Sequence, residues 1–133
     1  DGIGIMVLAV ANPELAMNPY NIQSMIIRFW DDSKSVVILG DAGIECGDKC
    51  LAQYGAYLNC DYMQMAHHGQ NGCSESFYKA IDFRACLWPT PSWVWEPAPE
   101  HTHLKTRETR RWMDEKGITE HHVSCIEKDW ILE

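Results

Sequence analysis

Two short apolar runs in this chain each end at a glycine that stands beside ionisable side chains. "SVVILGDAG" (35–43) leads into Asp41, and "YMQMAHHG" (62–69) leads into His67 and His68. Apolar runs of this length with turn residues at their ends predict strands. In an open α/β sheet, residues at the carboxyl ends of strands converge on the ligand site. The sequence therefore predicts that a carboxylate and an imidazole meet at one rim of a sheet.

The rest of the chain alternates strand and helix patterns. Strands are predicted at 4–10, 23–30, 35–40, 62–66 and 84–88, and a terminal hairpin is predicted from 118–125 and 129–133. Helices are predicted at 48–54, 74–81 and 105–117. Loops are predicted at 12–21 and 89–101. The turn "DDSK" should join 23–30 and 35–40 into a hairpin. Ser74 is predicted to cap its helix, and Gly117 to end the last one. This alternation indicates an α/β domain, with a mixed sheet and helices on one face.

Composition narrows the function classes. The 133 residues, 46% of them hydrophobic, fit one globular domain, and no apolar stretch reaches the roughly 20 residues that span a bilayer. A net charge of −8 argues against a passive nucleic-acid-binding surface. Nucleic acid stays open as a substrate if metal ions supply the positive charge. The six cysteines are expected to be free or buried thiols, because no Cys-x2-Cys pair starts a zinc site.

The side chains that follow the two predicted strands are candidates for metal binding. Asp and His together suit zinc or manganese, and an Asp carboxylate can bridge two ions. Asp41, His67 and His68 are therefore candidate metal ligands. Each motif alone has a simpler interpretation, since Gly-Asp after a strand is usually a turn and a His pair is often a surface or core feature. Their presence at two successive strand ends makes the metal site the more specific hypothesis.

Over nearly its whole length, the chain resembles the second half of a metallo-β-lactamase-fold hydrolase. The similar branch includes the extracellular nuclease-like domain of the ComEC/Rec2 competence proteins. That branch typically shows an Asn-x-x-Ser strand start, a strand ending in Gly-Asp, an acidic helix, a strand ending in His-His-Gly, and a Ser-rich turn. The matching residues are Asn21 and Ser24, Gly40-Asp41, Glu45, His67-His68-Gly69, and Ser74 with Ser76.

The family's His-x-His-x-Asp-His motif is nowhere in this chain. The resemblance therefore implies the C-terminal half of an αββα sandwich, as a single partial domain over 1–133 whose missing N-terminal half is its partner. It places Asp41 at the bridging-carboxylate position and the His67-His68 pair at the second-half histidine position, of which one ligates metal and the other contacts the substrate or orients the ligand. The complete domain would hold two zinc or manganese ions.

Other side chains are weaker candidates. His103, in "EHTH", is a further candidate metal ligand, because this branch often carries a histidine near that position. The alternative for His101 and His103 is plain surface or a helix N-terminus. His121 and His122 alternate along a strand, so at most one faces inward. Trp93 and Trp95 are expected to cover the core or form a domain contact, and the alternative is a lid or base-stacking platform over the cleft.

Two function classes follow. The first is the C-terminal part of a metal-dependent hydrolase of phosphodiesterase or nuclease type, acting on a phosphodiester or nucleic acid. The second is a non-catalytic structural or interaction module that keeps the same architecture. The chain alone should bind metal weakly, because tight sites need three or four protein ligands per ion. It should also self-associate as a homo-oligomer, because the missing half would leave an apolar sheet face uncovered.

Overall fold

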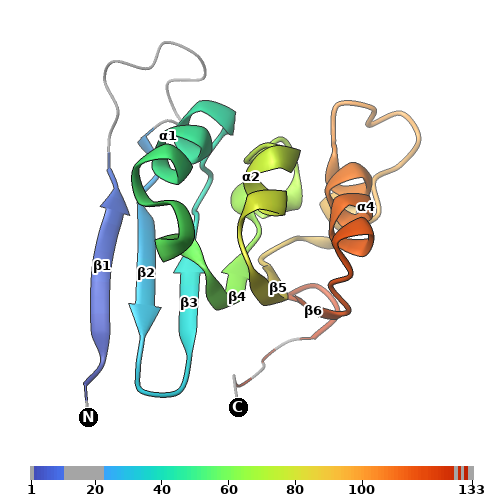
Figure 1. The fold of residues 1–133 in the computed structure, drawn as a ribbon. Helices are drawn as coiled ribbons and strands as arrows, with labels where there is room; N and C mark the ends of the chain where they lie inside the picture. Colours follow the sequence, from blue (N-terminus) through green and yellow to red (C-terminus); the bar gives the residue numbers. More distant parts are fainter. Residues whose placement is uncertain (1, 11–22, 128, 130, 132–133) are drawn as a thin grey trace.

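A single six-stranded mixed sheet organises the chain (Figure 1). This computed structural model describes residues 2–10, 23–127, 129 and 131, so the predicted loop 12–21 and Asn21 lie outside the described residues. The strands, which follow the chain order across the sheet, are β1 Gly4–Ala9, β2 Ile26–Trp30, β3 Ser35–Ile38, β4 Cys60–Gln64, β5 Phe83–Trp88 and β6 Glu120–Val123. The predicted α/β class with a mixed sheet and flanking helices is confirmed.

The first three strands are antiparallel and the last three interstrand pairs are parallel. β1 pairs with β2, and β2 pairs with β3, in antiparallel register, so the predicted hairpin around "DDSK" is confirmed. The pairs β3–β4, β4–β5 and β5–β6 are parallel. Parallel neighbours need a crossover, which helices supply. Asp41 and the His67-His68 pair therefore follow two adjacent parallel strands and lie at the same rim.

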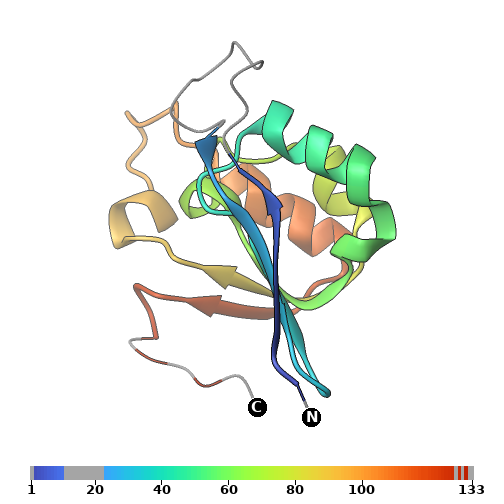
Figure 2. The ribbon, with the colours of Figure 1, turned by 90° about the vertical axis from the view of Figure 1, so that its left-hand side faces the viewer.

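The helical connections cover one face of the sheet (Figure 2). The helices that form this cover are α1 Ile44–Tyr54, α2 Glu75–Ala80 and α4 Thr106–Lys116. The connections also contain the short helix α3 Ser92–Trp95 and the 3-10 turns η2 Gly55–Leu58 and η3 Ala66–Gly69. The predicted Ser74 cap is confirmed, since its Oγ accepts a hydrogen bond of 3.1 Å from the Phe77 amide. Gly117 ends α4 at φ 83°. The core between helices and sheet is built on Ile26, Leu39, Met63, Phe77, Trp88 and Met113.

The structure differs from the sequence prediction in several segments. The predicted loop 89–101 contains the short helix α3. α1 begins at Ile44 and not at Asp48, running through Gly47, where an added β-carbon would lie 2.7 Å from Cys73 Sγ. Glycine is used there for close packing and does not interrupt the helix. In the first arm of the predicted terminal hairpin, 118–125, the structure has β6, which lies parallel to β5 because α4 is a crossover. Of the expected partner strand 129–133, only residues 129 and 131 are described.

The second face of the sheet carries apolar side chains without helices over it. The registers place Ile5, Phe29, Val36, Tyr62 and Ala85 opposite one another in a row across five strands. At the β4–β5 end this row is buried, with Tyr62, Ala85 and Leu87 in a small separate cluster. At the β1 end it is open, since Ile5 is 63% and Val7 47% exposed. We call this surface the open face.

Candidate metal centre

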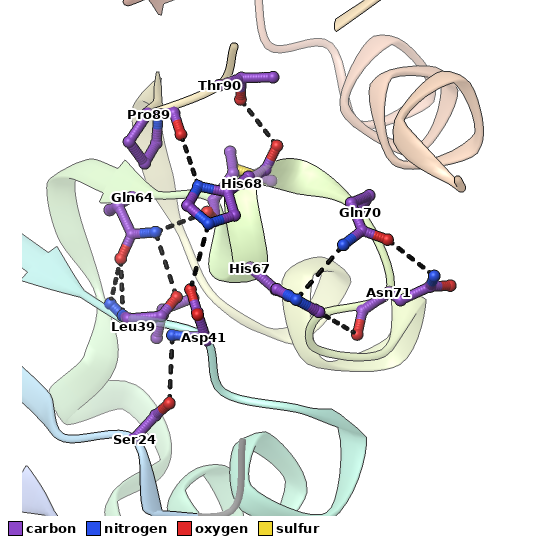
Figure 3. Close-up of polar contacts among 12 residues, drawn as sticks. Ser24, Leu39, Asp41, Gln64, His67, His68, Gln70, Asn71, Pro89 and Thr90 are labelled. Atoms are coloured by element: carbon purple, nitrogen blue, oxygen red, sulfur yellow. Dashed lines mark hydrogen bonds and ion pairs between the residues drawn. The ribbon is translucent and has the colours of Figure 1, made fainter. Parts of the chain in front are cut away.

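Asp41 and His68 face each other across the rim where β3 and β4 end (Figure 3). Asp41 follows β3, and its backbone amide donates a hydrogen bond of 3.2 Å to Ser24 Oγ. His68 lies in η3, directly after β4. The distance from His68 Nε2 to Asp41 Oδ1 is 3.9 Å, and each side chain is about half exposed, at 47% and 48%. An accessible carboxylate and imidazole therefore meet as the strand pattern predicts.

The second ring nitrogen of His68 is held by backbone. Nδ1 lies 2.8 Å from the Pro89 carbonyl oxygen, which can only accept, so Nδ1 carries the proton. In the neutral form of this ring the unprotonated nitrogen is Nε2, and it is the one that faces Asp41. A histidine that donates one ring N–H to a carbonyl and offers the other nitrogen has the usual arrangement of a metal ligand.

The separation of the two side chains suits a shared ion. Zinc binds imidazole nitrogen and carboxylate oxygen at about 2.0–2.2 Å in tetrahedral geometry, which puts two ligand atoms roughly 3.4 Å apart. The 3.9 Å between Nε2 and Oδ1 is within a side-chain rotation of that value. A carboxylate oxygen and an imidazole nitrogen are donor types that zinc and manganese accept, and this pair supplies two of the three or four ligands that a tight site needs.

His67 is turned toward the loop that follows it. Its Nε2 lies 3.3 Å from Gln70 Nε2, and its Nδ1 lies 3.5 Å from the Asn71 carbonyl oxygen. The two histidine rings are 6.0 Å apart, centroid to centroid. The sequence left open which histidine of the pair is the ligand, and these contacts favour His68.

The backbone of the His-His-Gly segment is strained. His67, His68 and Gly69 have φ of 51°, 60° and 82°, and a left-handed conformation costs roughly 1–2 kcal/mol for each non-glycine residue. Three contacts hold the segment: the His67 amide donates to the Gly40 carbonyl at 2.9 Å, the Gln70 amide to the His67 carbonyl at 3.1 Å, and Thr90 Oγ1 to the His68 carbonyl at 2.7 Å. Strain of this kind, retained by its surroundings, is typical of functional sites.

Sequence analysis did not identify Gln64 or the Pro89 carbonyl as parts of this site. Gln64 is 7% exposed and bonds the backbone at the ends of both β3 and β4. In the sequence it looks like any polar residue in an alternating strand. Pro89 lies 21 residues after His68, and no local pattern signals that its carbonyl meets the imidazole.

The remaining histidines have other contacts. The His103 carbonyl accepts a hydrogen bond of 2.8 Å from Asn71 Nδ2, which brings its loop beside η3, while its ring lies 5.9 Å from that of His101. His121 accepts a hydrogen bond from Trp88 Nε1. His122 lies between Glu120 and Glu127, and these hydrogen bonds, that of Glu120 foremost, raise its pKa. In the part of the chain that the structure describes, no three or more His, Cys, Asp or Glu side chains form a group that could hold a metal ion.

The cysteines have the character of core residues. All six are free thiols, and only Cys125 is exposed. Burial raises the pKa of the Cys50 thiol to about 11 and that of Cys60 and Cys86 to about 12. Thiols with such pKa values are protonated at neutral pH and are poor metal ligands or nucleophiles. The chemistry of this rim therefore rests on oxygen and imidazole.

No protein-family model matches this chain, and a search of curated proteins likewise gives no match. Within the described residues, none of the helices is both long and apolar enough to cross a bilayer.

Proposed function

We propose that this chain is the C-terminal half of a metallo-β-lactamase-fold hydrolase, similar to the ComEC/Rec2 branch, that cleaves phosphodiesters. The observation that carries the proposal is the pairing of His68 Nε2 with Asp41 Oδ1 at 3.9 Å, with Nδ1 of the same ring fixed on a carbonyl. The order of the motifs along two adjacent parallel strands supports it as well.

In this proposal, Asp41 and His68 hold zinc or manganese together with ligands from a companion half. Divalent ions bound there would polarise the phosphoryl group and supply a hydroxide at neutral pH. His67 stands beside them, with its ring oriented by Gln70 and Asn71, and contacts the substrate. His103 belongs to the neighbouring loop and is the further candidate ligand from this chain.

The open face is the surface for the companion half. Its row of apolar side chains runs across five strands, and helices cover the opposite face. Sheets that pack face to face bury such rows at a spacing of about 10 Å. A second sheet seated on Ile5, Val7 and Phe29 would complete a sandwich and leave the Asp41–His68 rim accessible at its edge.

The test is phosphodiester hydrolysis by a longer form of the protein that includes the companion half. With bis(p-nitrophenyl) phosphate and Mn²⁺ or Zn²⁺, we expect Asp41→Asn and His68→Gln each to lower kcat/KM by at least about 100-fold, since loss of a ligand costs more than loss of its outer-shell partner. Asp48→Asn is the matched control, because the Asp48 carboxylate lies on α1 and accepts a hydrogen bond from the Ser74 hydroxyl at 2.9 Å, without a described contact to Asp41 or His68.

The outcomes separate the two function classes. Hydrolysis that is sensitive to Asp41 and His68 but not to Asp48 supports the hydrolase. A longer form that folds, binds neither ion and hydrolyses nothing would instead support the non-catalytic structural or interaction module.

A further inference from the structure

The Gln64 side chain fills the gap between the ends of β3 and β4 (Figure 3). Its Oε1 accepts hydrogen bonds of 2.7 Å from the backbone amides of both Leu39 and Gly40. Its Nε2 donates to the Met65 carbonyl at 2.6 Å and to the Gly40 carbonyl at 3.3 Å. A carboxamide has two acceptor lone pairs and two donor hydrogens, so these four contacts use its full capacity.

The Gln64 side chain connects β3 and β4 beyond the last backbone pairing of these two strands. The two strands are in register at Val36 with Tyr62 and at Val37 with Met63. Beyond them, the Leu39 and Gly40 amides bond the Gln64 amide group and not the β4 backbone. β4 meanwhile continues along β5, through the pairing of Gln64 with Leu87 and the Met65 amide on the Leu87 carbonyl. The two strand ends are therefore joined through one side chain.

We propose that Gln64 is a positioning residue that sets the placement of Asp41 relative to His68. Asp41 directly follows Gly40, whose carbonyl accepts from Gln64 Nε2 and also from the His67 amide, at 2.9 Å. One peptide group thus connects the carboxylate strand, the Gln64 side chain and the strained histidine segment. A shift of the Gln64 amide moves both partners of the pair.

Only a carboxamide of this length satisfies all four backbone groups. Methionine would match its length and volume but would leave the Leu39 and Gly40 amides without an acceptor in a buried position. Glutamate would keep both acceptor contacts but would face the Gly40 and Met65 carbonyls with an oxygen that cannot donate. Gln64→Met and Gln64→Glu should therefore each disturb the contacts at the strand ends.

The same two strands offer a matched control at their other end. Asp61 Oδ2 accepts from the Ser35 amide at 2.7 Å and from Ser35 Oγ at 3.1 Å. Asp61→Ala therefore removes a bridge between β3 and β4 that is far from the rim. A residue of merely structural importance should behave like Asp61.

The experiment measures amide hydrogen exchange of His67 and, by calorimetry, Zn²⁺ binding in the 133-residue chain, with exchange corrected for global stability. In Gln64→Met we expect His67 exchange to be about 10-fold faster and the Zn²⁺ dissociation constant about 10-fold higher, the scale of an outer-shell loss. Gln64→Glu should also make His67 exchange faster, since it cannot donate to the Gly40 and Met65 carbonyls when ionised. Asp61→Ala should change neither quantity more than about 2-fold, although it lowers stability.

Unchanged His67 exchange in both Gln64 variants, or equal effects of Asp61→Ala, would overturn the positioning role. The measurement of Zn²⁺ binding rests on the proposed function, whereas the measurement of His67 amide exchange does not. If wild type binds no Zn²⁺ and His67 exchange still depends on Gln64, the proposed function fails and the positioning role stands.

Discussion

The indole of Trp88 lies directly against the α-carbon of Gly69: a β-carbon built on Gly69 would be 2.5 Å from Trp88 Cε3 and from Cζ3. Trp88 is almost fully buried at the end of β5, so the ring has no room to retreat. Gly69 also has φ of 82°, a conformation that favours glycine. This contact fixes how closely the histidine segment approaches β5.

Gly69→Ala should therefore destabilise the chain by about 2–5 kcal/mol, which combines a left-handed backbone cost of about 1–2 kcal/mol with overpacking of about 1–3 kcal/mol. Gly117→Ala is the control, since Gly117 has φ of 83° and open space where its β-carbon would stand. Urea unfolding of both variants measures the difference. Equal losses in the two variants would contradict the close contact at Trp88.

His122 should make stability depend on pH. The hydrogen bonds to Glu120 and Glu127 raise the folded-state pKa of His122 above its ordinary value of 6.5. A group with a raised folded pKa contributes stability that is fully present below its unfolded pKa and is lost as pH rises through the folded pKa. The melting temperature of wild type should exceed that of His122→Gln by more at pH 5.5 than at pH 8.5. A difference that grows toward pH 8.5 would have the wrong sign.

The open face should drive self-association of the 133-residue chain when no companion half is present. Exposed apolar surface of this kind favours burial at roughly 25 cal/mol per Å², and a two-fold dimer is the simplest way to achieve it. Val7→Lys should shift the chain toward monomer in sedimentation velocity. Ile44→Lys should not, since Ile44 is 57% exposed but lies on α1, on the helix-covered side. A monomeric wild type at micromolar concentration would refute this prediction.

Thiol labelling should modify Cys125 faster than the other five cysteines. Cys125 is exposed, whereas burial raises the pKa of the Cys73 thiol well above its ordinary value and raises those of Cys60 and Cys86 to about 12. A disulfide reagent at pH 7.5 should modify about one thiol per chain quickly and the rest only on unfolding. Cys125→Ser should abolish the fast phase, and a fast phase that persists in this variant would show a second accessible thiol.

The sequence predicted those parts of the molecule that depend on local pattern. The β2–β3 hairpin follows from its turn residues, the α2 start from Ser74, and the α4 end from Gly117. Asp41 and His68 could be placed at one rim because each follows a strand. This inference needs only the strand ends and no knowledge of individual contacts.

The remaining features of the site depend on contacts between residues that are far apart in the sequence, and local sequence patterns do not reveal such contacts. The preference for His68 over His67 depends on the carbonyl of Pro89, which belongs to a distant loop. The role of Gln64 depends on the end of the β3–β4 ladder, which its alternating neighbours do not reveal. The helix was predicted to begin only at Asp48, because the packing of Gly47 against Cys73 is visible only in three dimensions.

The central claim is that Asp41 and His68 form a metal-binding pair at this rim, and paramagnetic broadening by Mn²⁺ in ¹H–¹⁵N spectra of the 133-residue chain tests it most directly. We expect substoichiometric Mn²⁺ to broaden the amides of Gly40, Asp41, His68 and Gly69 first, and Asp41→Asn to abolish this selectivity. Broadening that centres instead on His122 and Glu127, or that is unaffected by Asp41→Asn, would contradict the claim.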